Sequence, residues 1–247
     1  MNNTTYIYNC IRSDSRSLAV LIDPEKCTKK DNLKELLDKA SFAAIDLVFV
    51  GGSTVTRSQF EQCVSWIKEL CTLPVVIFPG ASHQISREAD AILYLSLLSG
   101  RNPDFLIGHH VQSANELFEM DIEVIPTAYL LIDGGTVSSV AYVSQTTPIP
   151  RDNISIVKST AMAARMQGKQ LIYLDAGSGA RFRVPDEMVR EIKQVGLPVI
   201  IGGGVRDVET IRSLHDSGAN VVVIGNRLEE DTDLLLDIKS YVFEVKD

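Results

Sequence analysis

The chain has 247 residues, of which 45% are hydrophobic and 23% charged, and its formal net charge at pH 7 is −8. This length suits one large domain or two small ones and allows a substantial hydrophobic core. The acidic balance excludes a general nucleic-acid-binding protein, which needs a basic face, but it allows a small phosphorylated substrate held by backbone N–H groups and a metal ion.

The four cysteines, at positions 10, 27, 63 and 71, form neither a C-x-x-C pair nor the spacing of a zinc site. We interpret them as reduced thiols, the usual state in the cytosol. Residues 1–16 are polar and lack the apolar core of a signal peptide, and no apolar run is long enough to span a bilayer. We therefore expect a cytoplasmic protein without a transmembrane segment.

Four apolar runs in the first half of the chain predict buried strands, at residues 18–22, 47–50, 75–78 and 91–95. Apolar residues recur at helical spacing after the first, second and fourth of these runs. Thr28 with Asp31, and Thr56 with Gln59, match the capping box that begins a helix. The polar segment 81–89, which follows the third run, lacks a helical stripe.

The second half of the chain repeats this alternation, with apolar runs at residues 122–132, 171–175, 198–201 and 221–224. Helical spacing predicts helices at residues 153–167 and 231–243, and two more that begin at Pro185 and Asp207. Residues 140–150 hold two prolines and several hydroxyl side chains, so we expect an extended excursion there.

Eight apolar runs that mostly alternate with helical stretches predict an α/β fold of the (β/α)8 TIM-barrel class, in a single domain over residues 1–247. A doubly wound sheet is the alternative, but eight units in a chain of this length favour a closed barrel. In TIM barrels the active site lies at the carboxyl ends of the strands. We therefore expect the residues that follow the strands, among them Asp23, Ser53 and Asp175, to meet at one mouth.

Three glycine-rich strand ends predict a phosphate site. The first is the segment Tyr173, Leu174, Asp175, Ala176, Gly177, Ser178 and Gly179, and the others are Gly203-Gly204 and Gly225-Asn226. Glycines let backbone N–H groups approach an anion closely, and the loops after strands 7 and 8 of a TIM barrel commonly bind phosphate. One glycine pair can simply form a tight turn, but three coordinated sites favour a phosphate monoester.

Two carboxylates and two hydroxyls near these strand ends are candidates for chemistry. Asp23 and Ser53 carry hard oxygen ligands, which suit a Mg²⁺ ion that bridges to substrate phosphates. Taken alone, Asp23 fits a helix-capping turn equally well. Tyr173 and Asp175 alternate with the strand period, so both point to one side of the strand. The Asp175 carboxylate can accept a proton from a substrate hydroxyl, and Tyr173 can donate a hydrogen bond or stack against developing positive charge.

Five segments of the chain resemble the geranylgeranylglyceryl phosphate synthase family, in order from the first strand to the eighth: residues 21–26, 51–53, 173–179, 202–206 and 225–226. The resemblance implies a TIM barrel, modified around the third strand, that acts as a Mg²⁺-dependent prenyltransferase in phospholipid biosynthesis. sn-Glycerol 1-phosphate would attack C1 of a long prenyl diphosphate, geranylgeranyl diphosphate being the expected donor. An ether bond would form and diphosphate would leave.

The same resemblance assigns roles to individual residues. Asp23 and Ser53 would bind Mg²⁺, and Asp175 and Tyr173 would be catalytic. The segment from Tyr173 to Gly179 would bind sn-glycerol 1-phosphate together with Gly203, Gly204, Gly225 and Asn226. Family members usually have Glu where this chain has Asp175, so either the substrate sits closer or a water intervenes. The Ala-Gly-Ser-Gly form resembles the second group of the family, which implies a homo-oligomer.

A prenyl tail would need an apolar groove, and several residues near the strand ends can line one: Phe78, Tyr94, Leu97, Leu98 and Tyr129. Two other classes of protein fit the glycine loops. One is an FMN-dependent barrel oxidoreductase, which also places a phosphate after strands 7 and 8, and a yellow purified protein would support it. The other is a non-catalytic barrel that binds phosphometabolites, which the Asp at position 175 suggests.

Overall fold

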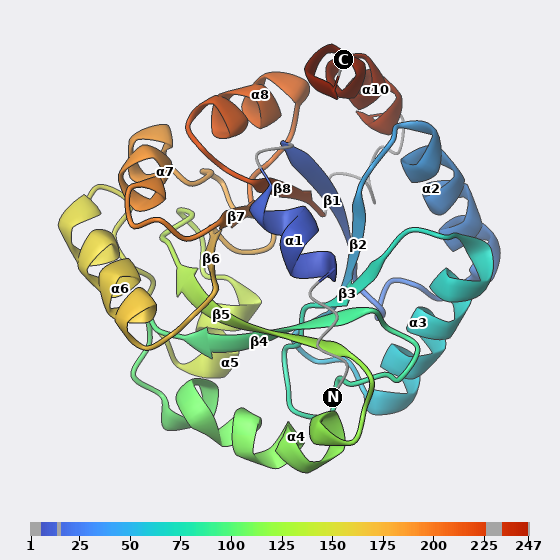
Figure 1. The fold of residues 1–247 in the computed structure, drawn as a ribbon, viewed down its shortest axis with the longest axis horizontal. Helices are drawn as coiled ribbons and strands as arrows, with labels where there is room; N and C mark the ends of the chain where they lie inside the picture. Colours follow the sequence, from blue (N-terminus) through green and yellow to red (C-terminus); the bar gives the residue numbers. More distant parts are fainter. Residues whose placement is uncertain (1–5, 14–15, 226–233, 247) are drawn as a thin grey trace.

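Eight parallel strands pair in chain order and form a closed ring. They are β1 (Ser17–Ile22), β2 (Leu47–Val50), β3 (Val75–Ile77), β4 (Ala91–Leu97), β5 (Glu123–Leu131), β6 (Leu171–Asp175), β7 (Val199–Gly202) and β8 (Val221–Ile224). The structure is a computed structural model, which describes residues 6–13, 16–225 and 234–246. Figure 1 looks down this ring and shows helices around its outside. The predicted (β/α)8 fold class is confirmed.

Side chains alternate between the inside and the outside of the ring, as the two-residue period of a strand requires. On β6, Leu171 and Tyr173 belong to the core inside the barrel, whereas Ile172 and Leu174 pack outward against the helices. Asp175 follows Tyr173 by one strand period and therefore also faces the interior, at the carboxyl end of the strand.

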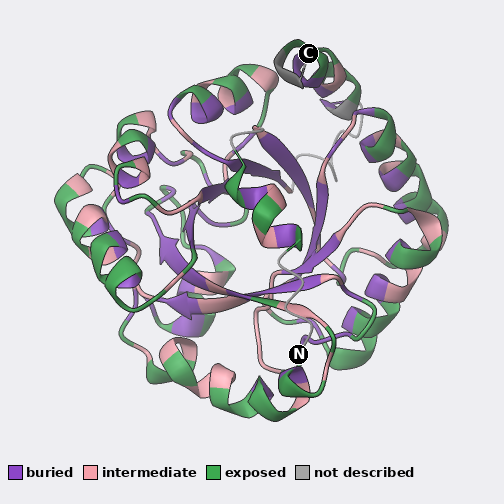
Figure 2. Cartoon of the chain, in the orientation of Figure 1, coloured by how far each residue is buried: buried purple, intermediate pink, exposed green. Residues whose placement is uncertain are grey.

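Helices cover the outer surface of the barrel and one of its ends. They are α1 (Tyr6–Arg12), α2 (Lys30–Phe42), α3 (Arg57–Leu70), the single π-helical turn η1 (Asp104–Gly108), α4 (His109–Phe118), α5 (Ser139–Ser144), α6 (Ile154–Met166), α7 (Asp186–Lys193), α8 (Val208–Asp216) and α10 (Leu234–Lys246). The outer helices bury an apolar stripe and leave the opposite face to solvent, which Figure 2 shows as purple and green sides.

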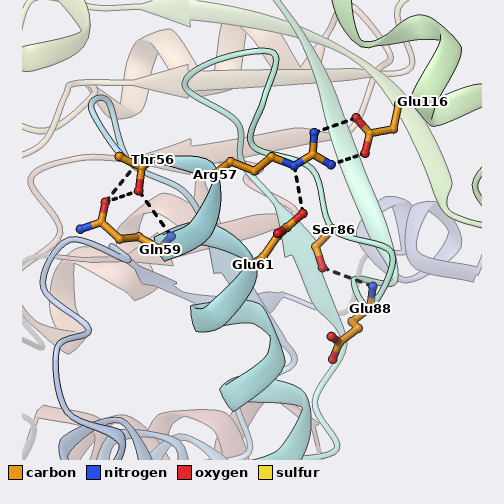
Figure 3. Close-up of polar contacts among 7 residues, drawn as sticks. All are labelled: Thr56, Arg57, Gln59, Glu61, Ser86, Glu88 and Glu116. Atoms are coloured by element: carbon orange, nitrogen blue, oxygen red, sulfur yellow. Dashed lines mark hydrogen bonds and ion pairs between the residues drawn. The ribbon is translucent and has the colours of Figure 1, made fainter.

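The connection from β3 to β4 contains no helix. Residues 78–90, all of which the structure describes, run between the two strands as turns and bends. Arg57 on α3 crosses to α4, where its guanidinium donates to Glu116, and it also donates to Glu61 on its own helix at 3.0 Å (Figure 3). The two helices that flank the gap are therefore tied together, and the barrel is modified around the third strand as the resemblance implies.

Two local predictions are wrong. Residues 139–144 form helix α5 instead of an extended segment, because Ser138 caps the helix and both prolines lie beyond its end. Thr28 does not cap α2, because its N–H still donates to the Lys26 carbonyl in the turn after β1 and the helix begins only at Lys30. The second predicted capping box, between Thr56 and the residue three positions on, is confirmed at the start of α3.

Helix α1 closes the amino end of the barrel. Ile7 and Ile11 are buried in the core inside the ring, and the N–H groups of Ile7 and Tyr8 donate to the Glu123 carboxylate at 2.7 and 2.9 Å. Glu123 begins β5, so this contact lies at the end opposite to Asp175. The carboxyl ends of the strands are left open for a site. None of the helices in the described part of the chain is both long and apolar enough to cross a membrane.

Candidate active site

A cavity of about 830 Å³ opens at the carboxyl ends of the strands. The predicted site residues that line it are Asp23, Ser53, Tyr173, Asp175, Gly177, Ser178, Gly179, Gly203, Gly204 and Gly225. Leu174 does not line it, because it packs outward against the helices, and neither does Ala176, which is buried with its N–H bound to the Gly202 carbonyl. Asn226 lies outside the described residues. The strand ends therefore share one mouth, as expected.

Asp175 is almost fully buried, and both of its carboxylate oxygens accept hydrogen bonds. Oδ1 accepts the N–H of Gly177 at 2.8 Å, and Oδ2 accepts the hydroxyl of Tyr129 at 2.5 Å. Burial raises the pKa of Asp175, and the two hydrogen bonds oppose that rise. The bond to Gly177 also fixes the start of the glycine loop relative to the carboxylate.

Three aromatic rings form a layer below this carboxylate. Tyr173 stacks on Phe78 with ring centroids 4.8 Å apart and planes 18° apart, and Tyr129 meets both rings edge-on. The Tyr173 hydroxyl lies against the backbone of Gly202, where a Cβ atom would come within 2.4 Å of it. Stacked and edge-on rings restrict one another, so the position of Tyr129 next to Asp175 is well defined.

The loops after β6 and β7 touch each other through glycines. Gly203 has a φ of +81°, and a Cβ atom there would lie 2.8 Å from the Gly177 nitrogen and 2.9 Å from Asp175 Oδ1. Only glycine allows both this backbone conformation and this approach. Arg206 lines the cavity beside these loops and donates to the Ala180 carbonyl at 3.0 Å. The loops thus offer close backbone approach and a positive charge to an anion.

Asp23 lies against the loop that carries Ser53. A Cβ atom at Gly52 would come within 2.7 Å of Asp23 Oδ1, so the carboxylate touches the residue that precedes Ser53. The N–H of Glu25 donates to Asp23 Oδ1 at 3.0 Å. Burial raises the pKa of Asp23, the hydrogen bond from the Glu25 N–H opposes that rise, and the charge of the Glu25 carboxylate adds to it. A cation at this position would stabilise the charged form of Asp23 against burial and against the Glu25 charge.

The oxygens of Asp23 and Ser53 fit a Mg²⁺ ion by their chemistry. Both are hard donors that line a cavity with room for waters and phosphate oxygens, which complete the coordination of Mg²⁺ in most enzyme sites. In the part of the chain that the structure describes, no three His, Cys, Asp or Glu residues gather into a metal-ligating cluster.

The cavity passes out of the ring of strands into the space that the missing helix leaves. Ile92 and Tyr94 lie on the outer face of β4, yet both line the cavity, together with Phe105, His109 and Ser113 from η1 and α4. Of the residues predicted to form an apolar groove, Phe78, Tyr94, Leu97 and Tyr129 line it, and Leu98 does not. This arm of the cavity is walled by apolar and aromatic groups.

His110 belongs to the same wall and is held as a neutral, stacked ring. It lies 4.1 Å from the Tyr94 ring centroid, and its Nε2 contacts the Leu95 carbonyl at 2.7 Å. Burial lowers the pKa of His110, so the ring is uncharged at neutral pH. A neutral aromatic wall is compatible with a hydrocarbon ligand.

Comparison with known proteins places this geometry in a family. Residues 11–242 match the PcrB family. The chain belongs to this family. It is 46% identical over 228 residues to the geranylgeranylglyceryl phosphate synthase of Chitinophaga pinensis, an alignment that covers 92% of this chain and 90% of that protein. It is 39% identical over 229 residues to the synthase of the same name from Korarchaeum cryptofilum, covering 92% and 93% of the two chains.

The fold of this PcrB-family chain also matches a solved structure of a synthase. The crystal structure of (S)-3-O-geranylgeranylglyceryl phosphate synthase from Thermoplasma acidophilum, in complex with its substrate sn-glycerol-1-phosphate, superimposes with a TM-score of 0.89 and 34% identity. The match covers 97% of this chain and 98% of that one. These findings confirm the resemblance drawn from the five sequence segments.

Three residues of the PcrB-family site were not predicted from the sequence as site residues with polar roles. Tyr129 was expected only in an apolar groove, but it binds Asp175. Glu25 lines the cavity and accepts the Thr54 hydroxyl. Gln84 is fully buried and donates to the Gly52 carbonyl at 2.8 Å. The register of β5 and β6 sets Tyr129 beside Tyr173 and so brings the first of them to Asp175, and no local sequence pattern reveals that register.

Proposed function

We propose that the protein is a prenyltransferase that joins sn-glycerol 1-phosphate to a long-chain prenyl diphosphate, with geranylgeranyl diphosphate as the expected donor. The observation that carries the proposal is the shared cavity: the oxygen ligands after β1 and β2 and the glycine loops after β6, β7 and β8 open onto the same space. Two phosphorylated substrates can therefore lie within reach of each other, with Asp175 in the cavity wall. The names of the relatives and the substrate of the Thermoplasma acidophilum enzyme support this assignment.

The glycine loops would bind the phosphate of the acceptor. Gly177, Gly179, Gly203 and Gly204 line the cavity, and all four have positive φ, a conformation that other residues rarely adopt. Arg206 adds a positive charge at the same edge. A phosphate monoester is the ligand for which such a loop set is best suited.

At the other side of the mouth, Asp23 and Ser53 would hold a Mg²⁺ ion, which supplies the charge that offsets a departing diphosphate. The loops that bear them lie next to the outer arm of the cavity. The prenyl tail would lie in that arm, against Ile92, Tyr94 and Phe105. The donor would thus be bound at both ends, by charge at the diphosphate and by apolar contact along the tail.

The reaction needs a base, because the primary hydroxyl of the acceptor is a weak nucleophile. As its oxygen attacks C1 of the donor, a C–O bond forms, the C1–O bond to diphosphate breaks, and diphosphate leaves with the bonding electrons. The proton of the hydroxyl must be accepted in the cavity, and the Asp175 carboxylate in the cavity wall would be its final acceptor. An allylic carbon tolerates developing positive charge, which the Tyr173 ring can stabilise.

An assay with labelled glycerol phosphate tests the proposal. The purified protein should convert labelled sn-glycerol 1-phosphate and geranylgeranyl diphosphate into a lipid-extractable product, and should do so only when Mg²⁺ is present. The 3-phosphate isomer and donors of several lengths define the specificity. Absence of product with every donor would contradict the proposal and favour a binding protein, and a flavin chromophore in the purified protein would favour the FMN-dependent barrel.

We also propose that the protein acts in the cytoplasm as a homo-oligomer. Large apolar side chains at and beside α5 support an intermolecular contact, since Val137 is 83% exposed and Tyr142 80% exposed in the single chain. Analytical ultracentrifugation measures the oligomeric state directly. A single species with the mass of one chain at micromolar concentration would contradict the oligomer.

A further inference from the structure

The residue proposed as the base is an aspartate whose carboxylate is already engaged on both oxygens. Gly177 occupies one oxygen and the Tyr129 hydroxyl occupies the other at 2.5 Å. The Tyr129 side chain lines the cavity next to Asp175, and its hydroxyl stands at one of the two carboxylate oxygens.

Tyr129 is held in this position from several sides. Its ring meets Phe78 edge-on at 5.7 Å and Tyr173 edge-on at 5.6 Å, and its side chain is only 5% exposed, yet it lines the cavity. A phenol that donates its proton to a carboxylate keeps its oxygen lone pairs for a second donor. The oxygen of Tyr129 can therefore accept a hydrogen bond from a substrate hydroxyl while it donates to Asp175.

We propose that Tyr129 is a catalytic residue that relays the proton of the acceptor hydroxyl to Asp175. As the acceptor oxygen forms its bond to C1 of the prenyl donor, the proton of that oxygen moves to Tyr129 Oη, and the proton of Tyr129 moves to Asp175 Oδ2. The tyrosine ends with one proton, Asp175 ends protonated, and diphosphate leaves with the electron pair of the broken C1–O bond. This inference rests on the proposed prenyl transfer.

The surroundings support transfer through the phenol in one concerted step. Burial and the adjacent Asp175 carboxylate raise the pKa of Tyr129, so the phenol remains protonated and donates to the carboxylate at neutral pH. A separate tyrosinate is thereby disfavoured, and the two protons must move together. Hydrogen bonds in a buried chain reinforce one another, which favours such coupled movement. Tyr173 cannot replace Tyr129 here, because its hydroxyl lies against the Gly202 backbone.

Two substitutions test the relay by loss and rescue. Tyr129→Phe keeps the ring and removes the hydroxyl, and should lower the single-turnover rate by ~100-fold or more while the KM for glycerol phosphate changes little. Adding Asp175→Glu to Tyr129→Phe should raise the single-turnover rate about tenfold or more above that of Tyr129→Phe, because the longer carboxylate can take the proton directly. If Tyr129 had only a structural role, lengthening the side chain at position 175 by one methylene would not restore the rate.

A proton inventory supplies a readout that does not depend on any variant. The single-turnover rate of the wild-type protein, plotted against the fraction of D₂O, should curve, because two protons move in the step. The doubly substituted protein should give a straight line, because one proton moves. A straight line for the wild type would overturn the relay even if Tyr129→Phe failed to fold.

Tyr241→Phe is the matched control. Tyr241 is also buried, and its hydroxyl contacts His215 Nδ1 at 2.5 Å, but it lies on α10 and does not line the cavity. The single-turnover rate of the Tyr241→Phe protein should equal that of the wild type. A wild-type rate in folded Tyr129→Phe, or a loss that Asp175→Glu does not recover, would overturn the relay. Absence of product from the wild type itself would instead overturn the proposed function.

Discussion

Glu25 reaches from the loop after β1 to the loop after β2, where its Oε1 accepts a hydrogen bond of 2.5 Å from the Thr54 hydroxyl. The first of these loops carries Asp23 and the second carries Ser53. The contact therefore links the two loops that carry the proposed metal ligands. Because a metal site is weakened when its ligands are poorly positioned, this contact outside the ligand pair should affect metal binding.

Thr54→Val removes the hydroxyl and keeps the shape of the side chain. It should weaken Mg²⁺ binding by about tenfold, the lower end of the range for residues that orient metal ligands. Isothermal titration with Mg²⁺ and a non-reactive diphosphate measures the effect without turnover. Thr54→Ser retains the hydroxyl and is the control. Equal affinity of the Val and Ser variants would show that Glu25 does not position the site through Thr54.

Gln84 anchors the irregular segment that replaces a helix. Its Nε2 donates to the Gly52 carbonyl and its Oε1 accepts the Gly80 N–H at 2.9 Å. Gln84→Leu would leave both backbone groups without that partner and should lower the free energy of unfolding by about 2 kcal/mol. Urea denaturation measures this.

The control for Gln84 lies on α4 and contacts the same segment. Gln112 accepts the Ser82 hydroxyl at 2.7 Å, but this contact is exposed to solvent. Gln112→Leu should therefore change the free energy of unfolding by no more than about 0.5 kcal/mol. Similar losses in both variants would mean that burial of the amide is not what matters.

Gly203→Ala should disturb the phosphate loop. The residue has positive φ, and the added Cβ atom would approach the Gly177 nitrogen and Asp175 Oδ1 closer than a real contact allows. We expect the KM for glycerol phosphate to rise by about tenfold or more, which corresponds to ~1.4 kcal/mol of lost binding.

Gly168→Ala separates backbone strain from this contact. Gly168 has the same φ of +81°, but nothing lies within 4 Å of its Cβ position. This variant should lose about 1 kcal/mol of stability and keep its KM. If the KM rose in both variants, backbone strain alone, and not the contact at Gly203, would explain the higher KM.

Asp175→Asn should lower the single-turnover rate by ~100-fold or more, since the amide cannot accept the proton. The KM for glycerol phosphate should change little, because the backbone loops bind the phosphate. A wild-type rate would remove Asp175 from the mechanism.

The pH dependence follows from the raised pKa of Asp175. Because the carboxylate must be ionised to act as a base, the rate should fall as pH decreases through its pKa. Since burial raises that pKa, the midpoint of the acid limb should lie above the ordinary ~3.9 of an aspartate. A rate profile of the wild type measures the midpoint, and the residual rate of Asp175→Asn should lack this limb. A midpoint at or below the ordinary value would contradict the effect of burial.

Strands and strand ends were predictable because their signal is local. The runs at 171–175 and 221–224 match the observed strands to the residue, and the two-residue period placed Tyr173 and Asp175 on one side. The short helix α5 was missed because two prolines near its end suggested an extended segment, whereas a cap at Ser138 decides the conformation.

Contacts between distant segments could not be predicted in this way. Tyr129 reaches Asp175 only because β5 and β6 pair in the register that sets Tyr129 beside Tyr173. Gln84 reaches Gly52 only because the chain after β3 turns back over the loop after β2. No local sequence pattern encodes the β5–β6 register or the turn after β3. The motifs therefore identified the strand ends but not the side chains, Tyr129 and Gln84, that contact them.

The missing helix after β3 has a consequence for ligands larger than the barrel interior. A closed ring of helices would oblige a long hydrocarbon to fold within the mouth or to wait for part of the protein to move. Here residues 78–90 cover the flank beside β4 in place of a helix, and the cavity extends along Ile92 and Tyr94 on the outer face of that strand. On the proposed function, a long hydrocarbon would therefore have room to extend out of the ring of strands. A substrate whose tail is still dissolved in lipid could then react without being extracted completely.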